Sequence, residues 1–376
     1  MSAYLTRIVV IAGAGAGLTL LAGCDLGPKD SIQTGYRGAG LDQITDRGHV
    51  AKASAIPAAP YPLPPDGGPT AGESYQNIKV LGGVSKERFD HLMAEITQWV
   101  APPEQGCNYC HNPANLASDE KYTKVVARRM LQMTQTINSR WASHVKQTGV
   151  TCYTCHRGNV IPQNKWALAE GSPESDTILG NRHGQNAPDA NVGYASLPSD
   201  PFAAYFEGRG NIRVASNQSL PSPDHVVSIK DAERSYGLMM HISSALGVNC
   251  TYCHNTQSFR AWNLSRAQRG TAYYGIRMVR NINDDYLTSL ASVFPANRKG
   301  PHGDVYKVNC TTCHQGVSKP LGGVSMLAQA PALRGSPQRI AAQEGGPGAG
   351  TAVPKAFNAP EGMTGKNEPA PTTSRR

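Results

Sequence analysis

The chain has 376 residues, and its 36 Lys and Arg exceed its 27 Asp and Glu, giving a formal net charge of +9. A hydrophobic content of 39%, with 39 Gly and 27 Pro, is unfavourable to a large core built from side chains alone. Beyond the N-terminus no stretch is apolar for long enough to cross a bilayer, which excludes a polytopic membrane protein and predicts a soluble body.

Residues 1–23 are typical of a lipoprotein signal peptide. Arg7 is followed by an apolar run, Ile8 to Ala22, which is shorter than the roughly 20 residues that a spanning helix needs. Small residues lead directly into Cys24, as at a lipoprotein processing site. We expect Cys24 to be a lipidated mature N-terminus that anchors the protein on the periplasmic face of a bacterial inner membrane. The alternatives, an uncleaved signal anchor or cleavage without lipid, leave the body on the same side.

Three segments are expected to lack regular structure. Residues 24–75 form a tether and an extended linker, because the run 58–65 is rich in Pro and has no helical period. Residues 170–224 form a turn-rich connection. Residues 331–376 are dominated by Gly, Pro and Ala and predict a disordered tail, with a docking role as the alternative.

Apolar residues at intervals of three and four predict four amphipathic helices. The first stripe runs from Phe89 to Val100, after a possible cap at Ser85. The others run from Val125 to Ile137, from Leu238 to Leu246 with Gly247 as a C-cap, and from Tyr273 to Val279. These helices alternate along the chain with the motif described next.

The sequence Cys-x-x-Cys-His occurs four times and uses all but one of the nine cysteines. Two thiols at this spacing can each form a thioether with one vinyl group of a porphyrin, and the imidazole of the following His then reaches the iron. A redox or zinc Cys-x-x-Cys is the alternative, but it gives no reason for a His after every pair. We therefore predict four covalent haem c groups. The thioether cysteines are Cys107 and Cys110, Cys152 and Cys155, Cys250 and Cys253, and Cys310 and Cys313; the iron ligands are His111, His156, His254 and His314.

An internal repeat organises these motifs, since residues 76–169 and 225–330 each read as helix, motif, helix, motif. The duplication predicts two dihaem halves related by a pseudo-twofold axis. Four haems also bring about eight propionate charges, which offset the basic excess of the chain. The positive charge therefore does not indicate a nucleic-acid partner.

The sixth ligand of each iron is sought on the helices, where Met93, Met130 and Met239 precede three of the motifs. A Met on an apolar helix face more commonly fills a core. Here each helix needs a ligand that faces a haem, which favours coordination. Met278 is the repeat-equivalent of Met130, so symmetry alone would nominate it for the fourth iron.

The chain resembles the tetrahaem cytochrome c subunits of purple-bacterial photosynthetic reaction centres. The similarity spans roughly residues 15 to 320, and its distinctive strings are Ile96 to Val100, Val126 to Met130, Thr148 to Gly158 and Gly275 to Arg280. It implies a fold that is mainly α with much irregular coil. It further implies three Met/His irons, with Met93, Met130 and Met239 as ligands, and one His/His iron, with His144 as the distal ligand of the His314 haem.

The resemblance also implies a function in electron transfer rather than catalysis. Electrons would pass from a soluble cytochrome c or a high-potential iron-sulfur protein to the bacteriochlorophyll special pair, which is bound by membrane subunits of the L and M type. The haem of Cys250 and Cys253 would lie nearest the pair, and that of Cys107 and Cys110 outermost.

Two alternative functions are weaker. A multihaem reductase needs one five-coordinate iron, whereas every motif here ends in His and has a candidate sixth ligand. A quinol-oxidising tetrahaem cytochrome needs a true spanning helix.

Overall fold

A computed structural model describes five stretches of the chain: 27–35, 40–169, 186–208, 210–214 and 228–335. The predicted signal peptide and Cys24 lie outside these residues, as do parts of the connecting segment and of the tail. Within the described stretches, no helix combines the length and apolarity needed to cross a membrane.

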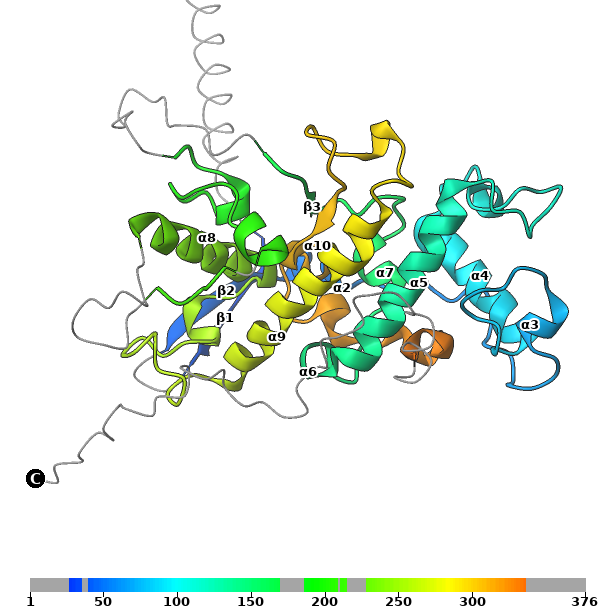
Figure 1. Ribbon diagram of the computed structural model, residues 1–376. Coiled ribbons are helices and arrows are strands. Elements are labelled where there is room, and N and C mark those ends of the chain that lie inside the picture. The colour runs from blue at the N-terminus through cyan, green and yellow to red at the C-terminus, as the bar shows by residue number, and fades with distance from the viewer. Residues whose placement is uncertain (1–26, 36–39, 170–185, 209, 215–227, 336–376) are drawn as a thin grey trace, which may run out of the picture.

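Four long helices form the frame of the fold and confirm the four predicted stripes (Figure 1). They are α4 (Lys86–Val100), α5 (Tyr122–Arg140), α8 (Ile229–Leu246) and α9 (Ala267–Asn281). The C-cap predicted at Gly247 is also confirmed, with φ of 61°. Ser85 precedes α4 but does not cap it, because its hydroxyl donates to Asp66 Oδ1 at 2.9 Å instead.

The helix predicted from Val125 to Ile137 ends before it reaches His144. It ends at Arg140, and Trp141 takes a non-helical conformation before the separate turn α6 (Ala142–Val145). The Trp141 indole nitrogen donates to Asn281 Oδ1 of α9 at 3.0 Å. His144 of α6 is held by α9, because its Nδ1 donates to the Thr271 carbonyl at 2.9 Å.

Three apolar clusters lie between the helices. The first joins α4 and α5 and includes Trp99 and Leu333, both fully buried. The second packs α5 and α6 against α9. The third packs α8 against α9 and the turn η3 (Ala203–Glu207) of the connecting segment, with Phe206 fully buried.

Residues 29–54, predicted to be an extended linker, are instead folded. The strands β1 (Lys29–Thr34) and β2 (Leu41–Asp46) pair antiparallel, with Lys29 opposite Asp46, and lead into α2 (Arg47–Ser54). The longest stretch without a helix or strand in the described part of this region is residues 55–69. The prediction failed because the hairpin has no alternating apolar pattern and is held by contacts to distant residues instead.

The disordered tail was predicted to begin at residue 331, which is too early. The 3-10 turn η10 (Pro331–Arg334) is ordered and inserts Leu333 into the first cluster. Residues 336–376 of the predicted tail lie outside the described residues.

Short elements complete the described chain. They are α3 (Ala71–Ser74), η1 (Gly106–Tyr109), α7 (Cys152–His156), β3 (Lys165–Trp166), η2 (Ala190–Val192), η4 (Cys250–Tyr252), η5 (Ile282–Leu287), η6 (Thr288–Leu290), η7 (Ala296–Arg298), β4 (Lys307–Val308), α10 (Cys310–His314), η8 (Pro320–Gly323) and η9 (Met326–Ala328). The strands β3 and β4 form a second antiparallel pair, with Lys165 opposite Val308.

Candidate haem-attachment sites

The four motifs adopt two local geometries that alternate along the chain. The first and third contain the 3-10 turns η1 and η4, and each is followed by an isolated bridge, Asn112 to Asn115 and Asn255 to Ser258. The second and fourth are the five-residue helices α7 and α10. The sequence repeat is therefore reproduced in the backbone conformation of the motifs.

The helical motifs are closed at both ends in the same way. Thr151 and Asn309 form capping boxes at the N-termini, and Arg157 and Gln315 follow the C-termini with φ of 51° and 52°. Each of these left-handed residues is followed by a Gly at positive φ. Such ends turn the chain sharply, so that the His side chain is the last group of the helix.

The imidazole of each motif is held in the same manner, by a hydrogen bond from Nδ1 to a backbone carbonyl a few residues downstream. A carbonyl can only accept, so Nδ1 carries the proton and the lone pair of Nε2 remains available to a metal. The bonds run from His111 to Leu116 at 3.0 Å, His156 to Asn159 at 2.9 Å, His254 to Phe259 at 2.8 Å and His314 to Val317 at 3.0 Å.

Burial also favours the neutral form of these rings. It lowers the pKa of His156 and His254, and it lowers the pKa of His314 to about 4, with a smaller contribution from His144. Neutral imidazole is the form that binds iron. These rings therefore fit the role of iron ligands in a c-type site.

The structure brings His144 together with His314. Their ring centroids are 6.0 Å apart, and His144 Nδ1 donates to the carbonyl of Thr271 at 2.9 Å, which leaves its Nε2 available. Two imidazoles on opposite sides of one metal ion, each bonded at about 2 Å, have centroids about 6 Å apart. Gly275 of α9 makes room for the His144 ring, since a Cβ there would lie 2.6 Å from its Cε1.

The three candidate Met ligands lie on the predicted helices, one against each apolar cluster. Met93, Met130 and Met239 are all only partly buried. Met278 differs, because it is 7% exposed and belongs to the buried residues of the second cluster. Its packing is that of a core residue.

Two contacts involve sulfur atoms of the motifs, and the second departs from the predicted thioethers. Thr97 Oγ1 of α4 lies 3.8 Å from Cys107 Sγ of the first motif. Cys155 and Cys313, from the second and fourth motifs, are joined in a disulfide with Cα atoms 4.6 Å apart. A sulfur in a disulfide cannot also form a thioether, so these two residues can hold haem only after that bond is reduced.

Two buried ionisable residues near the Met ligands were not found from the sequence. Glu95 and His241 occupy equivalent positions of the repeat, two residues after Met93 and Met239, and are 0% and 3% exposed. Burial raises the pKa of Glu95 to about 8 and lowers the pKa of His241 to about 4. Both groups are therefore neutral near pH 7, but the sequence pattern gives no sign of their burial.

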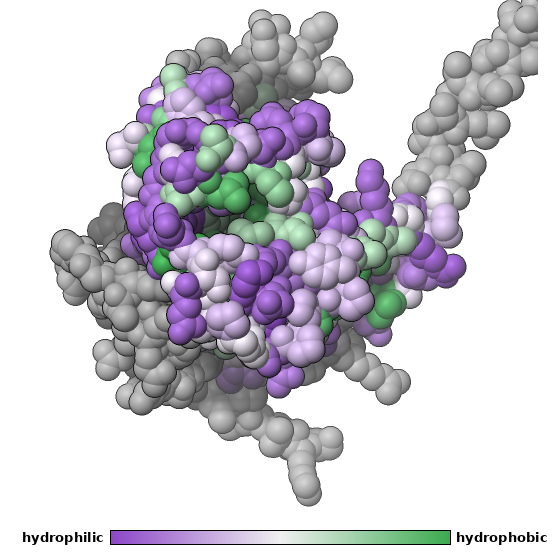
Figure 2. Space-filling view, turned by 90° about the vertical axis from the view of Figure 1, so that its right-hand side faces the viewer, coloured by the Kyte–Doolittle hydropathy of each residue, from purple (hydrophilic) through white to green (hydrophobic). Residues whose placement is uncertain are grey.

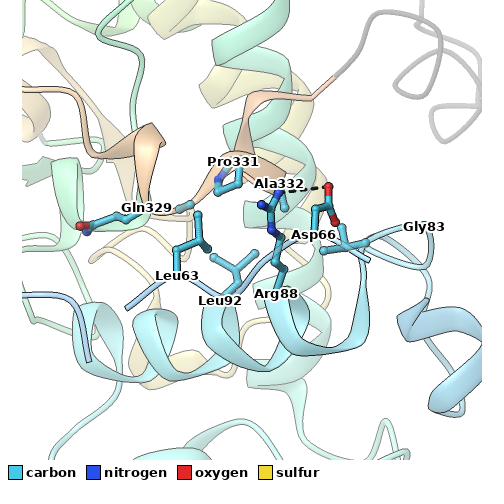
Figure 3. Close-up of a pocket in the computed structure, with 10 residues that line it drawn as sticks. Leu63, Asp66, Gly83, Arg88, Leu92, Gln329, Pro331 and Ala332 are labelled. Atoms are coloured by element: carbon cyan, nitrogen blue, oxygen red, sulfur yellow. Dashed lines mark ion pairs between the residues drawn. The ribbon is translucent and has the colours of Figure 1, made fainter. Parts of the chain in front are cut away.

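The end of the molecule that carries α4 and the first motif is hollowed, with apolar residues in the hollow and hydrophilic residues around it (Figure 2). A pocket of about 190 Å³ lies between α4 and residues 329–332 (Figure 3). Arg88 and Asp66 form an ion pair at its edge, at 3.1 Å. None of the predicted ligands or cysteines lines this pocket.

Comparisons of the sequence with known proteins show its family. A family model described as photosynthetic reaction centre cytochrome C subunit matches residues 25–334. The photosynthetic reaction center cytochrome c subunit of Rubrivivax gelatinosus is 48% identical over 342 residues, covering 90% of this chain and 93% of its own length. The proteins of the same name from Thermochromatium tepidum and Roseobacter denitrificans are 44% and 37% identical, covering 88% and 81% of this chain and 80% and 85% of their own lengths.

Proposed function

Because this chain belongs to the family of photosynthetic reaction centre cytochrome c subunits, we propose that it carries electrons through four haem c groups to the photo-oxidised bacteriochlorophyll special pair. Family membership makes it an electron-transfer component with covalently bound haem c, associated with the reaction centre and the photosynthetic membrane. The number of haems, the special pair as acceptor and the electron donor are parts of the proposal.

The observation that supports four haems most directly is the shared anchoring of the motif histidines. In all four, a backbone carbonyl accepts from Nδ1 and directs Nε2 away from it. In the proposal the two cysteines of each motif form the thioethers, and the His is the proximal ligand. When bound, haem iron would supply one-electron redox chemistry, and the motif His with a second side chain would hold each iron and leave no place for a substrate.

Met93, Met130 and Met239 are proposed as the distal ligands of three irons, and His144 as that of the fourth. The facing rings of His144 and His314 support the last assignment. Imidazole donates more strongly than thioether to ferric iron, so this haem should have the lowest potential in comparable surroundings.

The proposed orientation places the third motif nearest the membrane. If Cys24 is lipidated, Lys29 can lie at most about 17 Å along the chain from the anchor. The hairpin that begins at Lys29 is bonded to the third motif, because Thr251 Oγ1 donates to the Thr34 carbonyl at 2.8 Å and accepts from the Leu41 amide at 3.1 Å. This short connection supports a location on the periplasmic face beside L- and M-type subunits, with a soluble cytochrome c or a high-potential iron-sulfur protein as donor at the other end.

Flash spectroscopy of isolated membranes tests the proposal. Haem oxidation should follow a flash within milliseconds, and pyridine haemochrome analysis should give four haems per chain. If no haem is oxidised on that timescale, the reaction-centre role is wrong.

A substitution tests the fourth iron. His144→Met should retain four haems, raise one potential and remove one bis-histidine electron paramagnetic resonance signal. Survival of that signal with unchanged potentials would exclude His144 and make Met278 the leading candidate.

A further inference from the structure

The carbonyl oxygen of Leu116 accepts two hydrogen bonds of different kinds. One comes from His111 Nδ1 at 3.0 Å and the other from Lys124 Nζ at 2.8 Å. Lys124 also donates to the Ser118 carbonyl at 2.8 Å, and its side chain is only 10% exposed. A fixed, largely buried ammonium group therefore lies one hydrogen-bonded atom away from the proximal imidazole of the first motif.

This contact is specific to the first motif. In the described part of the chain, the equivalent carbonyls of Asn159, Phe259 and Val317 accept from their histidines but not from a charged side chain. The second half does have a cation in a similar place, Arg269. Its guanidinium donates to the carbonyls of Arg260 and Ala261, which follow Phe259 in the loop.

The surroundings of Lys124 remain positively charged. Asp119 is its nearest carboxylate, at 3.5 Å, but Arg128 at 2.7 Å and Lys79 at 3.2 Å also contact the same carboxylate group. Three cations thus share one anion. Asp119 cannot neutralise Lys124 fully, so a net positive field acts on the loop that holds His111.

We propose that Lys124 is a positioning residue that raises the reduction potential of the haem attached at Cys107 and Cys110. A cation bound to the Leu116 carbonyl makes that oxygen a weaker acceptor, so His111 keeps its Nδ1 proton more firmly and donates less strongly to iron. The cation also opposes the extra positive charge of the ferric state. Both effects favour the ferrous haem when one electron is added. This inference rests on the proposed attachment of haem at the first motif.

The size of the effect follows from the chain of contacts. Lys124 Nζ lies no more than about 10 Å from an iron bound at His111 Nε2, and a unit charge at that distance in a medium of effective dielectric constant near 20 changes an equilibrium about tenfold. For a one-electron couple, a tenfold change corresponds to about 59 mV.

Redox titration of the purified four-haem protein tests the inference with variants of opposite sign. Lys124→Gln should lower one of the four potentials by about this amount. Lys124→Arg keeps the positive charge, so that potential should change by only a small fraction of this amount. Asp119→Asn removes the shared anion and should raise the same potential. Met93→His shows which of the four potentials belongs to the first motif, because it changes the proposed sixth ligand of that haem.

Lys79→Gln is the matched control, because it removes one charge from the same cluster without touching the Leu116 carbonyl. A smaller shift than in Lys124→Gln supports the route through that carbonyl. Equal shifts in the two variants, no shift in Lys124→Gln, or a fall in Asp119→Asn would each overturn the inference. Wild-type protein with fewer than four haems would instead contradict the proposed function.

Discussion

Replacing Gly275 by Ala should displace His144, the proposed distal ligand of the fourth haem. The added Cβ would lie 2.6 Å from His144 Cε1 and 2.8 Å from Nδ1, whereas ordinary contacts begin near 3.4 Å. The ring or helix α9 must therefore move by about 0.8 Å, several times the roughly 0.2 Å within which metal-ligand distances are held. We expect Gly275→Ala to weaken or lose the bond between His144 and the iron.

The stability of this variant gives a second, independent measure. Ala in a helix interior is favoured over Gly by about 1 kcal/mol, but overpacking costs about 1–3 kcal/mol. The free energy of unfolding should therefore stay level or fall slightly, while the bis-histidine electron paramagnetic resonance signal diminishes and the lowest potential changes. Gly237→Ala in α8 is the control, because its Cβ would meet Val192 Cγ1 at 3.3 Å and no proposed ligand. A stabilised Gly275→Ala protein with an unchanged spectrum would refute the reasoning.

Three further outcomes are expected. Burial raises the pKa of Glu95 to about 8, so the folded chain holds a proton that the unfolded chain releases, and the free energy of unfolding should fall as pH rises from about 4.5 to 8. The loss should be roughly 3 kcal/mol at pH 7. Chemical unfolding of Glu95→Gln should show no such loss. Thr251→Val leaves the Leu41 amide without its partner and should destabilise the hairpin by about 1–3 kcal/mol. Hydrogen exchange over residues 29–46 should therefore be faster in the variant, and unchanged exchange would contradict this prediction. Cys24→Ser should block lipid attachment and release part of the unassembled protein from membranes, and mass spectrometry showing no lipid on native Cys24 would exclude this anchor.

The sequence predicted those parts of the structure that follow local rules. Helical periodicity located α4, α5, α8 and α9, and Gly247 ended α8 because a left-handed C-cap requires little beyond its own residue. The motif spacing likewise identified the four His whose Nδ1 donates to a carbonyl a few residues downstream.

The remainder depends on contacts between distant residues. Nothing near Trp141 signals a helix break, because the Asn281 side chain that accepts from its indole lies on another helix. The strands β1 and β2 carry exposed Ile32 and Ile44 rather than an apolar face, so no alternation marks them. The facing of His144 and His314 was anticipated only through resemblance to a family, since α6 and Gly275 together create it.

The two ends of the described chain each attach to the half that is more distant in sequence. Near the start, His49 of α2 contacts the Gln315 carbonyl at 3.0 Å, and Thr34 is bonded to Thr251. Near the end, Leu333 packs beside Trp99 and Leu92. As the chain is synthesised, residues 29–54 must therefore wait for the third and fourth motifs, and the first cluster must wait for Leu333. Both ends of the described chain thus reach their final contacts only after nearly all of it has been made.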